Sequence, residues 1–148
     1  MEATRTALIN HLKLAKDAPE VSTEALTIAK YAGQIKELAA RKTGVRMNLP
    51  AILVMFARGN PLGSRPIHGF SLFFIAETKL LSKKKSEADA LLLAGEYAKW
   101  LLENHQFDDA NSYYNIVELE RSEVSTLFND HKYTILEMPI NVAVNRGD

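Results

Sequence analysis

The sequence predicts an α+β fold, with a mixed, mostly antiparallel sheet of about four or five strands flanked by helices. Two nearly continuous apolar runs, 51-AILVMFAR-58 and 70-FSLFFIAET-78, indicate strands, the first buried on both faces. Apolar and polar residues alternate over Tyr133–Asn145, which indicates a third long strand. Apolar residues at three- and four-residue steps indicate helices elsewhere. The expected order is α-(β)-α-β-β-α-β-β in a single domain, 1–148.

The N-terminal third is expected to be mainly helical. Its first helix carries one apolar stripe, formed by Ala3, Ala7, Leu8, Leu12 and Ala15. This helix should end before Pro19, because proline disfavours helix in the residue before it. The stretch Leu26–Tyr31 is a short strand or the start of a helix, and the sequence leaves both open. A helix is expected over Gln34–Lys42, with Gly44 as its stop.

The middle of the chain holds a long loop and a long helix. The segment Gly59–Gly69 contains three Gly and two Pro and is expected to be a flexible loop, too long for a tight hairpin. Ser86 and Asp89 resemble a capping box that opens a helix over Glu87–Asn104. The residues of this helix expected to face the core are Leu91, Leu92, Ala94, Gly95, Ala98, Leu101 and Leu102.

The last third is expected to be β-structure. A strand is predicted over Ile116–Val124, followed by a turn at 129-NDHK-132 and the strand Tyr133–Asn145. One face of the last strand is expected to hold Thr134, Leu136, Met138, Ile140, Val142 and Val144. Because Pro139 has no N–H to donate, this strand should be an edge strand or be bulged there.

Composition excludes several classes of protein. Eighteen basic residues balance eighteen acidic ones, so no net charge draws the chain to nucleic acid or to a membrane surface. The chain has no cysteine, which excludes disulfides, thiolate zinc sites and a cysteine nucleophile. The charged N-terminal segment does not look like a signal peptide, and no apolar run approaches the length of a membrane span. We therefore expect a soluble, cytoplasmic protein.

No motif for catalysis, metal or cofactor binding is present. The four histidines, at positions 11, 68, 105 and 131, are scattered and lack the spacing of a helical metal site. The adjacent Asp108 and Asp109 suit a solvated turn better than a calcium loop, which needs more oxygen ligands. The Gly/Pro loop lacks the spacing of a phosphate-binding loop, and no nucleophile elbow occurs. We expect no enzyme activity, no cofactor and no metal.

Three kinds of surface remain as candidates for binding. The apolar arc of Leu93, Tyr97 and Trp100 is wider than one helix face needs, which favours either an interface or packing within the chain. The last strand could also pair with a neighbour if it lies at a sheet edge. A candidate basic patch consists of Arg41, Lys42, Arg46, Lys83, Lys84 and Lys85.

Several segments resemble a family of small tail-terminator or minor tail proteins of Mu-like contractile-tailed phages and prophages. They are 29-AKYAG-33, 49-LPAILVMFARG-59, 70-FSLFFIAET-78 and 133-YTILEMPINVAV-144. The resemblance implies a subunit that forms a six-fold ring, caps the tail tube and contacts neck proteins, with DNA at most passing through the ring. It implies residence in the host cytoplasm during assembly and then in the tail of the particle, with no membrane partner.

Under this interpretation the Gly/Pro loop is an arm that reaches a neighbouring subunit. The loop residues in the candidate interface are Asn60, Leu62, Arg65, Pro66, Ile67 and His68. The alternatives are a head–tail connector or another tail-assembly component, and a cytoplasmic regulator that binds a small molecule or nucleic acid. An enzyme comes last, and it would need a closed pocket that holds His68 with a buried carboxylate.

Overall fold

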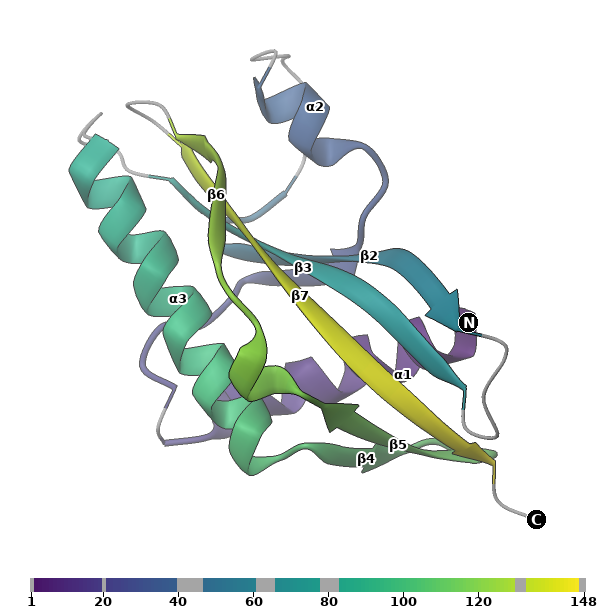
Figure 1. Ribbon diagram of the computed structural model, residues 1–148. Coiled ribbons are helices and arrows are strands. Elements are labelled where there is room, and N and C mark those ends of the chain that lie inside the picture. The colour runs from purple at the N-terminus through teal and green to yellow at the C-terminus, as the bar shows by residue number, and fades with distance from the viewer. Residues whose placement is uncertain are drawn as a thin grey trace.

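The computed structural model describes residues 2–19, 21–39, 47–60, 66–77, 83–129 and 133–146 (Figure 1). Within these residues the fold is α+β, as the sequence predicts. The helices are α1 (Glu2–Leu14), α2 (Gln34–Ala39) and α3 (Lys83–Glu103), with short 3-10 helices η1 (Ala15–Asp17) and η2 (Leu119–Arg121). The strands are β1 (Thr27–Lys30), β2 (Ala51–Asn60), β3 (Ile67–Glu77), β4 (Gln106–Asp108), β5 (Ser112–Val117), β6 (Ser125–Asn129) and β7 (Tyr133–Arg146).

The strands form one seven-stranded sheet, in the order β1-β2-β3-β7-β5-β4, with β6 paired to β7 as well. Only β1 and β2 run parallel, and all other described pairs are antiparallel. Strand β7 is central: β3 lies along one side, while β5 and β6 follow each other along the other side. The sheet therefore has more strands than the four or five expected.

Helix α1 contacts both β1 and β4, the two ends of the strand path, so the sheet curls around it. Figure 1 shows α1 behind the strands and α3 along one flank. The buried side chains of α1 and α3 form one large core with the inner face of the sheet, including Leu8, Phe74 and Tyr97. A smaller cluster on the outer face contains Phe73, and Ile35 of α2 packs against it.

Two sequence expectations about the strands are wrong. The predicted strand Ile116–Val124 is divided, because Glu118 adopts a left-handed conformation (φ 58°) and the chain passes through η2 before β6 begins. The short strand β4 was not expected at all. By contrast, the ambiguous segment Leu26–Tyr31 contains strand β1, and the predicted strand Tyr133–Asn145 matches β7.

Pro139 lies in the middle of β7, which is not an edge strand. Residues Met138–Ile140 pair with β3, but neither β5 nor β6 pairs with them on the other side. The missing N–H of a proline is tolerated where a strand lacks a neighbour. The expectation that this strand is an edge strand or is bulged at Pro139 is therefore wrong, because β7 has neighbours on both sides and its register with β3 is regular through Pro139. Strand addition along the whole of β7 is excluded by these neighbours.

The expected Gly59–Gly69 loop is shorter than predicted. Strands β2 and β3 continue into it and remain paired as far as Asn60 and Ile67. Residues 61–65 lie outside the described residues.

Helix α3 starts at Lys83, so Ser86 lies inside it rather than at its cap. No described helix is long and apolar enough to cross a membrane.

Candidate functional site

The candidate interface on α3 faces inward. Leu93 and Tyr97 are fully buried and Trp100 is nearly so, which means that they pack within the chain, one of the two alternatives left open by the sequence. The hydroxyl of Tyr97 accepts a hydrogen bond from the Ala25 N–H (3.2 Å), and burial raises the pKa of this phenol. The helix therefore turns its aromatic side toward the sheet.

The opposite side of α3 carries leucines that were expected in the core. Leu91, Leu92 and Leu102 are 50%, 50% and 47% exposed. Ala94 and Leu101 are buried as expected, so the error concerns the three leucines and Gly95, which is also exposed. Both sides of α3 are apolar, and no signal in the sequence decides which leucines meet the sheet. The buried side carries the larger rings, which fill the space under the curled sheet.

Some of the other candidate residues lie in or beside strand β3, and the rest lie outside the described residues. His68 lies in β3, where its Nδ1 is 3.0 Å from the Thr4 Oγ1 and its ring contacts Phe56 edge-on. No described Asp or Glu is buried, so the described residues do not supply the buried carboxylate that a His68 active site would need. Pro66 and Ile67 are half-buried.

Nine of the remaining residues cannot be placed on one surface. Leu62, Arg65, Arg41, Lys42 and Arg46 lie outside the described residues, as do the side chains of Asn60 and Lys83–Lys85. The basic patch therefore remains an expectation from the sequence. Among the described residues, no group of three metal-ligating side chains lies together.

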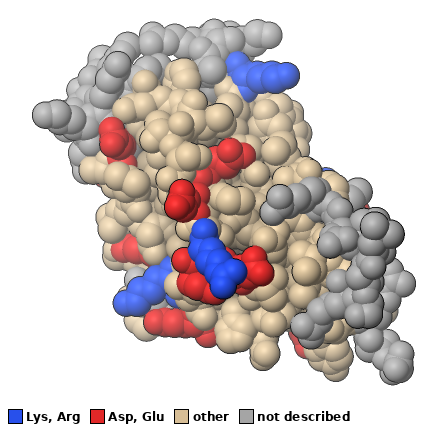
Figure 2. Space-filling model, in the orientation of Figure 1, with Lys and Arg blue, Asp and Glu red and all other residues tan. Residues whose placement is uncertain are grey.

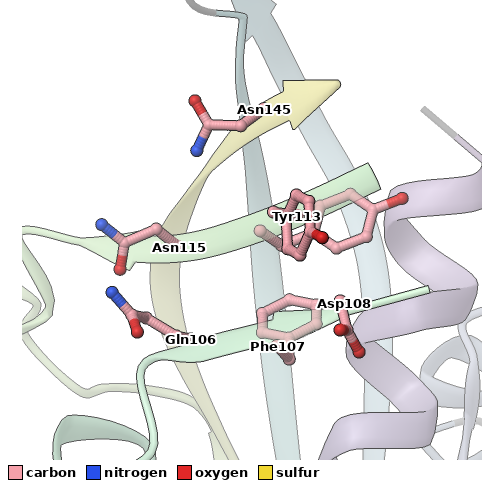
Figure 3. Close-up of a pocket in the computed structure, with 7 residues that line it drawn as sticks. Gln106, Phe107, Asp108, Tyr113, Asn115 and Asn145 are labelled. Carbon is pink, nitrogen blue, oxygen red and sulfur yellow. The ribbon is translucent and has the colours of Figure 1, made fainter. Parts of the chain in front are cut away.

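A polar hollow of about 430 Å³ lies on strands β4, β5 and β7 (Figure 3). It is lined by Gln106, Phe107, Asp108, Tyr113, Tyr114, Asn115 and Asn145. Strand pairing explains the arrangement, since Gln106 is opposite Asn115 and Tyr113 is opposite both Asp108 and Asn145. Figure 3 shows the Gln106 and Asn115 side chains next to each other on neighbouring strands.

Asp109 builds the turn that joins β4 to β5. Its carboxylate accepts hydrogen bonds from the N–H groups of Asn111 and Ser112 (both 2.8 Å) and from the Tyr114 hydroxyl (2.6 Å). The Tyr114 bond, followed by the backbone bonds, lowers the pKa of Asp109, while burial and Asp109 raise the pKa of Tyr114. This carboxylate thus has a local structural role in the turn.

The hollow offers hydrogen-bonding groups rather than a nucleophile and a base. Gln106, Asn115 and Asn145 each carry an amide, which can donate and accept. The Asn115 Oδ1 is buried, and no described residue bonds it, although most buried polar atoms are paired. The site is therefore suited to hold a polar group by hydrogen bonds.

A different kind of surface lies at β6. This strand pairs with β7 along one edge, and none of the described backbone groups bonds to its other edge. Its residues Ser125–Leu127 are exposed, Leu127 by 50%, and the register shifts between Thr126 and Phe128. Figure 2 shows that uncharged side chains cover most of this face, while acidic and basic ones gather over η2.

Comparison with known proteins gives no further assignment. A scan against protein-family models finds no match, and a search of curated proteins finds no similar sequence.

Proposed function

We propose that the chain is a structural subunit of a phage or prophage contractile tail, similar to the terminator that caps the tail tube and joins it to the neck. The resemblance of four sequence segments to that family motivates the proposal. Its partners are further copies of itself, the tail tube and the neck proteins. A head–tail connector or another tail-assembly component is the nearest alternative, because it would use the same kind of surface.

The free edge of β6 is the observation that carries this proposal. An unpaired strand edge offers N–H and C=O groups that another chain can complete by strand addition. Phe128 of β6 already packs at the rim of the outer-face cluster, so an added strand would extend both the ladder and the cluster. The bulge at Leu127 limits indiscriminate pairing, which favours a matched partner over aggregation.

A ring needs heterologous contacts, in which a surface of one subunit meets a different surface of the next. The edge of β6 supplies one such surface, and the half-exposed Leu91 and Leu102 of α3 supply another. The Gly/Pro loop at about 59–69 remains the proposed arm toward a neighbour, although its residues 61–65 lie outside the described residues.

The test is light scattering over a range of protein concentrations, followed by negative-stain imaging with purified tail tubes. Rings, alone or at tube ends, are expected for the wild type. Leu127→Asp should abolish them, because it places a charge at the free edge of β6. Leu14→Asp, at a position 62% exposed at the end of α1, is the matched control and should assemble normally.

Two results would overturn the proposal. One is a wild-type protein that ignores tail tubes at every concentration. The other is equal ring formation by Leu127→Asp and the wild type, which would remove β6 from the contact.

A second candidate function, binding of a small polar molecule, is favoured by the hollow beside Asn115. Asn115 lines the hollow, and no described residue bonds its Oδ1, which leaves a polar group there that needs a partner. A ligand screen read by thermal shift would reveal it, and the Asn115→Leu variant should lose the response.

A further inference from the structure

The sheet has a second free edge, at strand β4. The backbone hydrogen bonds on either side of β4 show which of its backbone groups point toward β5. The His105 C=O accepts from Ile116 N–H (2.8 Å) and the Asp109 N–H donates to the Ser112 C=O (3.1 Å), so both residues bond toward β5. Bonding directions alternate along an antiparallel strand. The backbone groups of Gln106 and Asp108 therefore point away from β5.

This edge is open. The only described strand that pairs with β4 is β5, and no described backbone bond completes the other side of Gln106 or Asp108. Figure 1 shows β4 at the lower margin of the molecule, with no helix or strand beyond it. The side chains of Gln106 and Asp108 are exposed, and that of Phe107 is half-buried against the inner core.

The segment 105-HQFDD-109 is complementary to itself when it is reversed. Two side chains that can donate hydrogen bonds come first, an aromatic ring is central, and two carboxylates come last. In an antiparallel pair centred on Phe107, Gln106 lies opposite Asp108 of the second copy. His105 then lies opposite the other copy's Asp109, and Phe107 lies opposite Phe107 of the other copy.

We infer that β4 pairs with β4 of a second copy of this chain across a two-fold axis through Phe107. The outward backbone groups of Gln106 and Asp108 form two reciprocal pairs, each exchanging both N–H···O=C bonds. Each Gln106 amide donates to an Asp108 carboxylate on the outer face, where opposite side chains interact directly. The interface is isologous, since each copy contributes the same patch.

The pairing also joins the two polar hollows. Asp108 and Tyr113 face each other across β4 and β5, and Gln106 faces Asn115. In the dimer these two rows become continuous across the axis, which creates one polar groove that spans both copies. Because the contact is a short strand, we expect a weak dimer that forms as concentration rises.

This inference does not rest on the proposed function, and it uses a different edge of the sheet. Sedimentation equilibrium without tail tubes should show a mass that rises toward twice the chain's 16.5 kDa. Amide exchange measured by NMR at low and high concentration should show added protection at Gln106 and Asp108. The amide of the exposed residue Glu24, which lies before β1 and in neither proposed contact, is the internal reference.

Charge variants test the register. Gln106→Asp places two like-charged pairs in the dimer and should raise its Kd roughly tenfold. The double variant Gln106→Asp/Asp108→Gln restores an amide opposite each carboxylate and should recover the wild-type Kd. Asn10→Asp adds the same charge at an exposed position of α1 and should leave the Kd unchanged.

The outcomes separate clearly. A monomer at all concentrations overturns the inference, as does a dimer that Gln106→Asp leaves unchanged or that protects amides elsewhere. Rings on tail tubes without the β4 dimer would retain the proposed function alone, and the β4 dimer without rings would retain this inference alone. A normal far-UV spectrum and unfolding midpoint for each variant show that the fold is intact.

Discussion

Phe73 and Phe74 are neighbours in β3, yet they belong to different cores. Phe74 points to the inner face, is fully buried and packs with the side chains of α1 and α3. Phe73 points to the outer face and is 4% exposed, in a cluster that consists mostly of half-buried residues. Two side chains can therefore be almost equally buried while the residues around them differ in how easily they can move into a cavity.

The largest effect is expected from Phe74→Ala, which should lower the free energy of unfolding by about 4–5 kcal/mol. Phe74 is paired with Ile52 of β2 and Leu136 of β7, in a cluster that also includes side chains of α1 and α3. These fixed elements cannot collapse into the space without moving. Urea unfolding followed by fluorescence of Trp100 measures the change. A loss below about 2 kcal/mol would contradict a rigid inner core.

Phe73→Ala is expected to cost less, about 3 kcal/mol, because half-buried neighbours can move into the cavity. Its ring contacts Tyr31 at a centroid distance of 5.3 Å, and Tyr31 can follow it inward. The two variants remove the same atoms from adjacent positions and so control for each other. Equal losses, or a larger loss for Phe73→Ala, would reverse the ranking of the two cores.

The sequence predicts the buried residues of the inner face well in strands where apolar and polar residues alternate. The six residues expected on one face of the last strand are all buried in β7. The sequence does not predict which leucines of α3 are buried. Leu91 and Leu93 are equally apolar, and only the packing of α3 against the curled sheet determines that Leu93 is buried and Leu91 exposed. The sequence also fails at β4, a three-residue strand that exists only because β5 pairs with it.

The candidate sites follow the same division. An exposed strand edge is a property of the sheet order, so no pattern in 125-STLFN-129 or 105-HQFDD-109 identifies one in advance. The sequence correctly predicts that Asp109 lies in a polar turn. The sequence does not predict the hydrogen bond between Asp109 and Tyr114, because that bond depends on how β4 and β5 are paired.

A third prediction concerns pH at the inner face, where α1 meets α3. His11 is buried between the rings of Trp100 and Phe107, with centroids 4.7 and 4.6 Å away, and its Nε2 lies 2.6 Å from the Asn104 carbonyl oxygen. Burial lowers the pKa of His11 and outweighs that hydrogen bond, which raises it. The folded protein therefore favours the neutral imidazole.

Because the folded pKa lies below the unfolded value, the unfolded chain binds more protons between the two. The stability from neutral His11 is complete above the unfolded pKa of about 6.5 and is lost as pH falls toward the folded pKa. The free energy of unfolding should therefore fall with decreasing pH by at most about 1.4 kcal/mol per pH unit. Urea unfolding at several pH values should show this slope, and His11→Phe should remove it. An unchanged slope in His11→Phe would assign the effect to other groups.

The smallest effect is expected from Tyr97→Phe, which keeps the ring of an inner-core residue and removes one hydroxyl. That hydroxyl accepts a hydrogen bond from the Ala25 N–H, and Ala25 is only 5% exposed. Without it the N–H is left unpaired, which should lower the free energy of unfolding by about 1 kcal/mol. The matched control is Tyr113→Phe, since Tyr113 is 61% exposed and should change stability little. If both variants unfold at the wild-type urea concentration, the Ala25 bond adds nothing to the attachment of the segment before β1 to α3, which Glu96 also binds through Ser22 and the Thr23 N–H.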